Sequence, residues 1–298
     1  TRCAIKSRGL GDVYKRQERS GSWATAKPMQ LGRYLERIAF LDAARPDIET
    51  LHGLLRAHVL AVPFENLDVQ LGRPLTTDVE DAYRKIVIDQ RGGWCYEQNG
   101  LFGWALAEIG FNVTRVAAAV MRAERGDVST ANHLALLVRT PDGSDTWLAD
   151  AGFGGSLLEP ILLAEHEYRH APFRLGLRSL DCGHWQFWED AGDGEFSYDF
   201  LPEAASEEAL SRKCHLLQTD PESSFVLNLV AQIRSADRHT SLRGRVLSIR
   251  DTAGERVTTL DSPEQLLATL RGIFRLEVPE IADCWARILE RHEQLFGN

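Results

Sequence analysis

The chain has 298 residues, of which 44% are hydrophobic and 26% are charged, and its formal net charge at pH 7 is -9. This composition is typical of a globular protein with one large or two to three small domains. The acidic balance argues against nucleic acid or an anionic membrane as a partner, because both bind basic surfaces. No apolar run reaches the roughly 18 residues that span a bilayer.

The first 28 residues are polar and basic and show no periodic apolar pattern and no apolar signal core, so we do not expect a secretory signal. We expect a disordered or non-native extension there, and a natural start at Met29. The five cysteines, at positions 3, 95, 182, 214 and 284, are scattered and form no C-x-x-C pair. Such usage is typical of a reduced, cytoplasmic protein.

Residues 29–110 have the periodicity of a helical bundle. The predicted helices are one from Leu31 to Phe40, one capped by Asp47 and ended by Pro63, one capped by Asp78, and one from about Cys95 to Gly110. The caps follow from the side-chain oxygens of Asp, which accept free N–H groups, and from glycine at the helix end.

Residues 111–215 have the pattern of an antiparallel sheet or barrel. The segment 111–122 is β-branched and Ala-rich, and HLALLVR (133–139) and TWLADAG (146–152) flank the turn cluster PDGSD. Two such segments around a turn predict a β-hairpin. Further short strands are expected up to residue 215.

Residues 216–298 are predicted to be a mixed α/β end. Strands are expected around 224–234 and 243–260. Two helices should follow, opened by Pro263 and Pro279, because proline is favoured in the first helical turn.

The stretch RGGWCYEQNG (91–100) places a cysteine where the predicted helix begins. Free N–H groups at a helix N-terminus favour the thiolate, which is the nucleophilic form of cysteine. Gly92 and Gly93 would let the chain turn tightly and leave the sulfur accessible. Cys95 is therefore a candidate nucleophile. The alternative is a small hydrophobic residue of the core, the commoner fate of a free cysteine.

The predicted hairpin offers a base and a group to orient it, which a nucleophilic thiol requires. With a four-residue loop, 141–144, Asp150 lies opposite Ala135. His133 then lies opposite Gly152, and all four side chains point to one face. His133 and Asp150 become diagonal neighbours about 7–8 Å apart at the backbone. An Asp in an apolar strand also needs a partner on energetic grounds.

Each of these residues also has a simpler interpretation. His133 could bond to the backbone at the start of its strand, and Asp150 could be a turn residue before a glycine-rich segment. Considered together with Cys95, they are candidates for a Cys-His-Asp triad.

Three other patterns are less specific. The run DAGFGG (150–155) follows a strand, so its N–H groups could approach a phosphate or thioester, or it is an ordinary loop. Two Cys-His clusters, at 182–184 and 214–215, fit no common zinc spacing, and we expect no metal. Several arginines of the late strands form either a solvated face or a site for an anionic cofactor: Arg234, Arg238, Arg243, Arg245 and Arg250.

The chain resembles the arylamine N-acetyltransferases of prokaryotic type over essentially all of residues 29–298. The resemblance rests on five segments in the family's order: AHVLAVPFENLDVQLGRPL (57–75), RGGWCYEQNGLF (91–102), NHLALLV (132–138), DAGFGG (150–155) and SSFVLNLVAQIRSADRHTSLRGR (223–245). It implies an α+β fold around a cysteine-protease-like triad core. The implied parts are an N-terminal helical bundle (29–110), a central antiparallel β-barrel (111–215) and a C-terminal α/β lid (216–298).

The resemblance also implies Cys95, His133 and Asp150 as the triad of a ping-pong acetyltransferase that uses acetyl-CoA as co-substrate and no metal. The thiolate takes the acetyl group, CoA leaves, and an arylamine, arylhydrazine or N-hydroxyarylamine attacks the acetyl-cysteine. His133 relays protons and Asp150 orients the imidazole. Such an enzyme acts in xenobiotic metabolism in the cytoplasm on small aromatic amines or hydrazines, and could form homo-oligomers.

Further residues match family positions around the substrates. Phe64 and Phe225 would line the acceptor pocket. Gly152, Phe153 and Gly154 would border the entrance for the acyl group and CoA.

Other matched positions concern support of the site. Glu65 and Arg91 would support it through an ion pair. Trp94 stands where the family more often has Phe or Tyr, which is an aromatic exchange. Asn132 stands where the family commonly has a Thr associated with CoA, although Asn also donates hydrogen bonds.

Three alternative functions share parts of this pattern. An amide synthase of antibiotic biosynthesis has the same fold and triad, and a cysteine hydrolase uses the same triad with water as acceptor. A silent CoA- or ligand-binding module would need a damaged triad, and none of the three residues is replaced. A missing acetyl adduct on Cys95 after mixing with acetyl-CoA would favour the amide synthase. Steady hydrolysis without added amine would favour the hydrolase. Iodoacetamide labelling of Cys95 no faster than that of free cysteine, and unchanged in His133→Ala, would favour the silent module.

Overall fold

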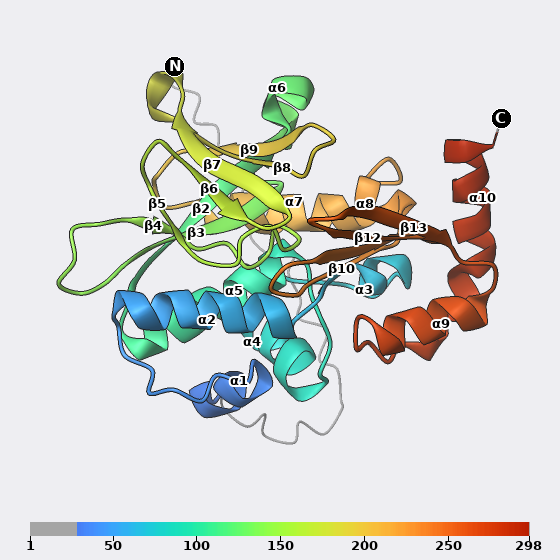
Figure 1. Ribbon diagram of the computed structural model, residues 1–298, viewed down its shortest axis with the longest axis horizontal. Helices are drawn as coiled ribbons and strands as arrows, with labels where there is room; N and C mark the ends of the chain where they lie inside the picture. Colours follow the sequence, from blue (N-terminus) through green and yellow to red (C-terminus); the bar gives the residue numbers. More distant parts are fainter. Residues whose placement is uncertain (1–28, 298) are drawn as a thin grey trace, which may run out of the picture.

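The computed structural model describes residues 29–297, so the extension predicted at 1–28 lies outside the described residues. Figure 1 shows a group of helices, a large sheet, and a smaller sheet with two helices beside it, in chain order. The predicted α+β succession of helical bundle, antiparallel sheet and mixed end is therefore observed. The division into parts at residues 110 and 215 stays a prediction.

The described chain begins with helices α1 (Leu31–Arg37), α2 (Ile48–Ala61), α3 (Leu67–Gln70), α4 (Val79–Tyr83), the π-helical turn η1 (Arg84–Ile88) and α5 (Cys95–Ile109). Asp47 and Asp78 accept N–H groups of the helices that follow, as predicted. Gly110 ends α5 with φ 110°. The first helix stops at Arg37 rather than Phe40, because Ala39 has a positive φ of 54°.

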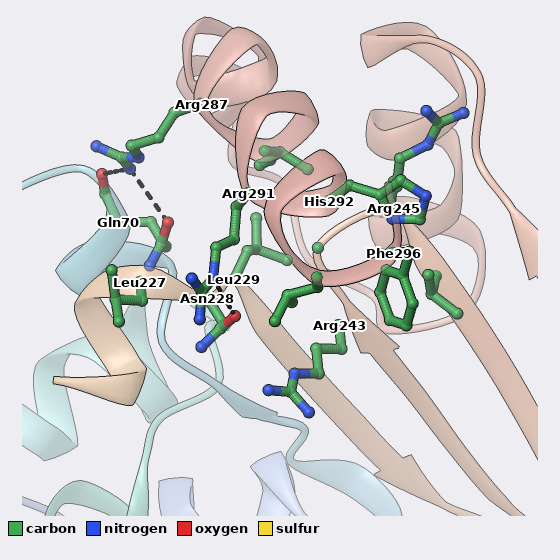
Figure 2. Close-up of a pocket in the computed structure, with 14 residues that line it drawn as sticks. Gln70, Leu227, Asn228, Leu229, Arg243, Arg245, Arg287, Arg291, His292 and Phe296 are labelled. Carbon is green, nitrogen blue, oxygen red and sulfur yellow. Dashed lines mark hydrogen bonds between the residues drawn. The ribbon is translucent and has the colours of Figure 1, made fainter. Parts of the chain in front are cut away.

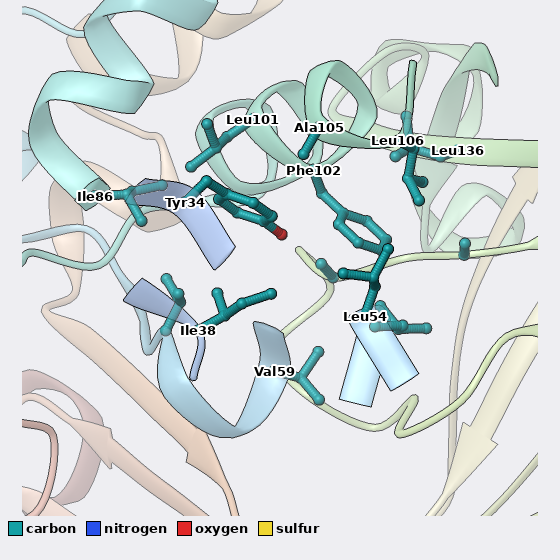
Figure 3. Packing of buried hydrophobic residues seen from close by; sticks show 14 of the residues in the cluster. Tyr34, Ile38, Leu54, Val59, Ile86, Leu101, Phe102, Ala105, Leu106 and Leu136 are labelled. Carbon is teal, nitrogen blue, oxygen red and sulfur yellow. The ribbon is translucent and has the colours of Figure 1, made fainter. Parts of the chain in front are cut away.

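One apolar core holds α5 between the other helices and the large sheet. Figure 3 shows Tyr34 of α1, Leu54 of α2 and Ile86 of η1 in one cluster with Phe102 of α5 and Leu136 of the sheet. All five are 0% exposed. Burial of one such aliphatic or aromatic side chain stabilises by about 1.5–3 kcal/mol. The middle of α5 is therefore held by residues from four other elements.

Residues 112–200 contain an eight-stranded antiparallel sheet in the order β5-β4-β3-β2-β9-β8-β7-β6. The strands are β2 (Asn112–Val120), β3 (His133–Arg139), β4 (Trp147–Leu148), β5 (Ile161–Leu162), β6 (His166–His170), β7 (Phe173–Ser179), β8 (Trp185–Asp190) and β9 (Glu195–Phe200). Short turns α6 (Arg122–Arg125), η2 (Gly126–Ser129) and η3 (Asp181–Gly183) connect them. The sheet is nearly closed, but among the described residues its edges β5 and β6 do not pair with each other.

The hairpin of β3 and β4 has the predicted register. Leu137 pairs with Leu148, and Val138 pairs with Trp147, which is the alignment that a loop at 141–144 requires. The side-chain period of two then places every second residue of both strands on the same face.

The second strand of this hairpin is shorter than the predicted 146–152. β4 contains only two residues. The Asp150 carboxylate accepts the N–H of Gly152 at 2.9 Å, which turns the chain out of the ladder. The acidic residue therefore lies just beyond the strand.

The C-terminal part contributes four strands to a five-stranded antiparallel sheet in the order β1-β10-β11-β12-β13, and the edge strand β1 comes from the helical part of the chain. The strands of this sheet are β1 (Phe64–Glu65), β10 (Val230–Arg234), β11 (His239–Arg243), β12 (Val246–Asp251) and β13 (Gly254–Thr259). The helices are α7 (Glu207–Thr219), α8 (Ser224–Leu227), α9 (Pro263–Gly272), the turn η4 (Pro279–Cys284) and α10 (Trp285–Phe296). Pro263 and Pro279 open the last helical segments, as predicted.

Two predictions in this part are wrong. The segment 224–234 is a strand only from Val230 onward, because the Ser223 hydroxyl accepts the N–H of Phe225 and starts the short helix α8. Residues 207–219, expected among strands, form α7, which Ser206 caps. That the C-terminal part acts as a lid stays a prediction.

Candidate active site

Cys95 is the first residue of α5. Trp94 precedes it in an extended conformation, and its N–H donates to the Glu97 carboxylate at 3.2 Å. Gly92 allows close packing of the preceding turn, since a Cβ atom there would lie 2.3 Å from the Pro63 carbonyl oxygen. The cysteine is buried but lines a cavity. Because it is the first residue of the helix, it lies at a helix end that carries free N–H groups.

His133 and Asp150 lie beside Cys95. His133 Nε2 is 2.6 Å from Asp150 Oδ2, and both side chains are buried. The Cys95 side chain lies close enough to act on the pKa of the imidazole, and both residues line the same cavity. The structure thus brings the three predicted residues together: the hairpin register joins the imidazole to the acid, and α5 presents the thiol.

Asp150 is a buried carboxylate with a complete set of donors. Besides His133, it accepts hydrogen bonds from Asn99 Nδ2 at 2.7 Å, from the Tyr198 hydroxyl at 2.8 Å and from Gly152 N at 2.9 Å. Burial by itself raises the pKa of Asp150, but His133, Asn99 and Gly152 hold this pKa below its usual range. The carboxylate therefore stays ionised at neutral pH.

The charge of Asp150 acts on His133. Burial by itself would lower the pKa of His133, but the Asp150 carboxylate and the neighbouring Cys95 raise this pKa to about 10. The imidazole is therefore protonated at neutral pH, and an imidazolium beside a cysteine favours the thiolate. The ring of Phe153 packs edge-on against His133 with centroids 5.2 Å apart, which restricts the imidazole plane.

The sequence analysis missed Asn99 and Tyr198. Asn99 also donates to the Leu134 carbonyl at 2.6 Å and accepts the Ala151 N–H at 2.9 Å, so it joins α5 to both arms of the hairpin. Its position one helical turn after Cys95 was an available signal, because residues four apart share a helix face. Tyr198 lies 48 residues from Asp150 on another strand, and no local pattern connects the two.

Gly152 is needed for the close approach of the hairpin to α5. A Cβ atom at Gly152 would lie 2.7 Å from Cys95 Cα and 2.8 Å from Asn99 Nδ2. Real Cβ atoms do not approach backbone so closely, so only glycine lets this segment touch the first turn of the helix.

Gly154 has a different environment. It adopts φ 107°, and a Cβ atom there would lie 2.1 Å from Gln232 Oε1. His239 Nε2 lies 2.9 Å from its carbonyl oxygen. Gly152 and Phe153 line the Cys95 cavity, whereas Gly154 lies outside its lining.

A cavity of about 200 Å³ opens beside Cys95 and His133. Phe64 of β1 and Phe225 of α8 form part of its wall, with ring centroids 6.4 Å apart. Phe153 contributes a third aromatic ring. Such walls suit a flat apolar molecule placed next to the thiol. The lining also includes Val120, Arg125, Phe196, Leu217 and Gln232.

Asn132 lies on the same wall, directly before His133 in the chain. Its Oδ1 accepts the Val120 N–H at 2.7 Å, and its Nδ2 donates to the Val120 carbonyl at 3.4 Å. The side-chain amide therefore ties β3 to the end of β2. A contact of Asn132 with CoA stays a prediction.

A buried cluster of charges lies on the other side of the first turn of α5. Arg91 pairs with Glu65 at 2.8 Å, which is the ion pair that the resemblance implied, and with Asp68 at 3.3 Å. Lys85, which the sequence analysis did not identify, lies 2.9 Å from Asp68 and 3.7 Å from Glu65.

Lys85 connects this cluster to the nucleophile's helix. Its Nζ lies 2.9 Å from Glu97 Oε2, the same oxygen that accepts the Trp94 N–H. Burial opposes the charge of Lys85, but the carboxylates of Glu65, Glu97 and Asp68 hold its pKa above the usual value. Burial raises the pKa of Glu97 to about 6, against the effect of Lys85.

The remaining patterns do not join this site. Within residues 29–297, no group of three or more His, Cys, Asp or Glu is arranged to hold a metal ion. No helix in that range has the length and apolarity needed to cross a membrane. Arg234 is only 3% exposed and donates to the carbonyls of His170 and Ala171, so a solvated face is wrong for this residue. Arg250, in contrast, pairs with Asp193 near the surface.

Comparison with known proteins agrees with this geometry. A family model described as N-acetyltransferase matches residues 47–283. The arylamine N-acetyltransferase of Mycolicibacterium smegmatis is 35% identical over 271 residues, which are 88% of this chain and 98% of the relative.

Solved structures show the same fold. A variant of the Mycobacterium smegmatis enzyme has a TM-score of 0.80 at 33% identity, covering 88% of this chain and 98% of that chain. The Mycobacterium marinum arylamine N-acetyltransferase in complex with CoA has a TM-score of 0.78 at 29% identity, with the same coverage of both chains. The chain belongs to the arylamine N-acetyltransferase family.

Proposed function

We propose that the protein transfers the acetyl group of acetyl-CoA to arylamines, arylhydrazines or N-hydroxyarylamines through an acetyl-Cys95 intermediate. The main support is the buried His133–Asp150 pair held against a thiol at the N-terminus of α5, beside a cavity with aromatic walls. Relatives named arylamine N-acetyltransferase, one of them solved with CoA, support the choice of substrates.

In the first half-reaction, the Cys95 thiolate attacks the thioester carbonyl of acetyl-CoA. The carbon–sulfur bond to CoA breaks, the acetyl group stays on Cys95, and His133 gives its proton to the departing thiolate. Arg125 on the cavity wall offers positive charge to the phosphates of CoA.

In the second half-reaction, the nitrogen or hydroxylamine oxygen of the acceptor attacks the acetyl carbonyl. His133, now neutral, takes the proton of the attacking group, and the Cys95 thiolate leaves with its electron pair. Phe64 and Phe225 hold the aromatic ring of the acceptor close to the carbonyl, which raises the effective concentration of the attacking group. Asp150 keeps the imidazole in one orientation through both steps.

The surrounding residues act on this chemistry through position. Asn132 and Phe153 shape the wall beside His133. The ion pair of Glu65 and Arg91 supports the turn that carries the thiol. Gly154 lies outside the cavity lining. It acts on the entrance for the acyl group and CoA only by fixing the backbone that follows Phe153.

The test is mass spectrometry of the protein and its Cys95 peptide after mixing with acetyl-CoA, beside Cys95→Ala. We expect one acetyl group on Cys95 in the native chain and none in the variant. Addition of an aromatic amine or hydrazine should remove it and yield the N-acetylated product.

The other outcomes separate the alternative functions. Steady loss of the adduct and turnover of acetyl-CoA without amine would indicate a hydrolase. If acetyl-CoA leaves Cys95 unmodified but a different acyl donor acylates it, the result would indicate an amide synthase. If no donor acylates Cys95, the result would contradict the proposal.

A further inference from the structure

Two pockets share helix α8 as a common wall. Ser224 and Phe225 line the Cys95 cavity, whereas Leu227 and Asn228 line a second pocket of about 90 Å³. Figure 2 shows this second pocket, which residues of α10 such as Arg291 and Phe296 line together with Arg243 of β11. The acetyl transfer proposed above uses none of the side chains of this second pocket.

The second pocket is cationic in an acidic protein. Arg243, Arg287 and Arg291 give it positive charge, His292 also lines it, and none of its lining residues is an Asp or Glu. In the described part of the chain, no carboxylate forms a salt bridge with any of these four side chains, although the net charge of the protein is -9. Arg245, at the same pocket, does pair with Asp261. A concave surface with uncompensated charge attracts anions.

Neutral partners hold two of these guanidinium groups in place. Arg287 Nη2 donates to the Gln70 carbonyl at 2.6 Å and to its Oε1 at 3.1 Å (Figure 2). Arg291 Nε donates to Asn228 Oδ1 at 3.2 Å, and Nη1 donates to Gln294 Oε1 at 3.1 Å. These bonds orient the groups without cancelling their charge, so a bound anion would lose little binding energy to their ordering.

Apolar side chains form the rest of the pocket. Leu229 and Ile288 are buried at its base, and Leu295 and Phe296 on the last turn of α10 are 41% and 62% exposed. An apolar wall that remains open to solvent next to guanidinium groups suits a ligand with an apolar stem and an anionic head.

We propose that the pocket between α8 and α10 binds a small organic anion, with a carboxylate or phosphate head and an apolar stem. The oxygens of the head accept hydrogen bonds from Arg243 and Arg291. The stem lies along Leu229 and Phe296. Binding at this site requires neither Cys95 nor acetyl-CoA, so it stands independently of the proposed acetyl transfer.

The test is calorimetric titration of the full chain with hexanoate, hexyl phosphate, acetate, inorganic phosphate and hexanamide. Hexanoate should bind at one site per chain, about tenfold or more tightly than acetate, because four additional methylene groups become buried. Hexanamide keeps the stem but lacks the charge, and should also bind at least about tenfold more weakly. The ratio between hexanoate and hexyl phosphate identifies the preferred head, and either order agrees with the proposal.

Variants locate the site. Arg243→Gln should weaken hexanoate binding about tenfold, because one charged donor is lost, and its guanidinium makes no hydrogen bond or salt bridge within the described residues that folding would miss. Arg212→Gln, which removes the same charge from an exposed position on α7, should leave the affinity unchanged. Arg125→Gln, in the Cys95 cavity, should also leave it unchanged.

Several results would overturn the proposal. They are an absence of hexanoate binding, equal binding of hexanoate and hexanamide, and inorganic phosphate binding as tightly as hexyl phosphate. Equal losses of hexanoate affinity in Arg243→Gln and Arg212→Gln would show that the net charge of the protein, and not this pocket, determines binding. A loss confined to Arg125→Gln would place the anion in the Cys95 cavity instead.

Discussion

Two buried sets of charges flank the first turn of α5, and they differ in what they contact. His133 and Asp150 form the first pair, and His133 lines the cavity beside Cys95. Lys85 and Glu97 lie on the other side, where Glu97 accepts the N–H of the residue before Cys95. Among these four residues only His133 lines the cavity beside Cys95. Burial and charge alone therefore do not distinguish the pair proposed to act in catalysis from the pair that supports the backbone.

The largest difference between the two sets should appear in Asp150→Asn. An amide in place of the carboxylate removes the charge that keeps His133 protonated and oriented, so kcat should fall about a thousandfold. The measurement is CoA release from acetyl-CoA with a saturating aromatic amine. A loss below tenfold in a variant that folds normally would show that His133 does not depend on this acid.

On the other side of α5, Lys85→Met should affect stability instead. It leaves the buried Glu97 without its cation and removes one of the cations that pair with Asp68, which costs about 3–5 kcal/mol in the free energy of unfolding by urea. Turnover per folded molecule should fall far less than in Asp150→Asn. The double variant Lys85→Met with Glu97→Gln should be more stable than additivity predicts, because one uncompensated charge is removed. Additive effects would mean that the pair contributes no coupling.

A smaller effect is expected from Tyr198→Phe. The hydroxyl donates one of four hydrogen bonds to Asp150, and its loss should lower kcat about tenfold with little change in KM. Tyr168→Phe is the matched control, because Tyr168 lies on β6 and does not contact the acid. Equal kinetics of the two variants would remove Tyr198 from the support of the site.

The smallest expected effect concerns pH, measured in a Cys95→Ala background so that this thiol does not titrate. Burial opposes protonation of His133, but the Asp150 carboxylate still raises its pKa above 6.5 in this background. The contribution of His133 to stability is therefore complete below pH 6.5 and is lost as the pH rises through the raised pKa. The difference in unfolding free energy between the background and His133→Gln should therefore shrink over this window.

His170 provides the opposite control for this measurement. Burial lowers the pKa of His170 to about 4, so its neutral form is favoured and its contribution is lost only as the pH falls. The corresponding difference for His170→Gln should be constant above pH 7. If the differences in unfolding free energy for His133→Gln and His170→Gln change with pH in the same way, the opposite pKa shifts of the two histidines would be contradicted.

Local patterns were sufficient for the parts of the fold that were predicted correctly. The limits of α5 follow from the cysteine after two glycines and from Gly110, and the hairpin register follows from the turn cluster at 141–144. The segment 224–234 failed because a short apolar run has no period that separates helix from strand. The Ser223 cap, which decides the outcome, was available but competed with the apolar composition of the segment.

The candidate site divides in the same way. The pairing of His133 with Asp150 was predictable, because strand alternation places both on one face and an acid in an apolar strand needs a partner. The role of Lys85 was not predictable, since its neighbour Arg84 gives it the pattern of an ordinary basic pair and its partners come from other helices. Lys85 and its carboxylate partners meet only in the tertiary structure. The residues that line the second pocket, at α10, are likewise far apart in the sequence and could not be grouped from local patterns.

The most direct measurement is the rate at which iodoacetamide alkylates Cys95 at neutral pH, in the native chain and in His133→Ala. A thiolate stabilised by the imidazolium should react faster than free cysteine, and the variant should lose most of that advantage. A native rate no higher than that of free cysteine, unchanged in His133→Ala, would show that the imidazole does not activate the thiol.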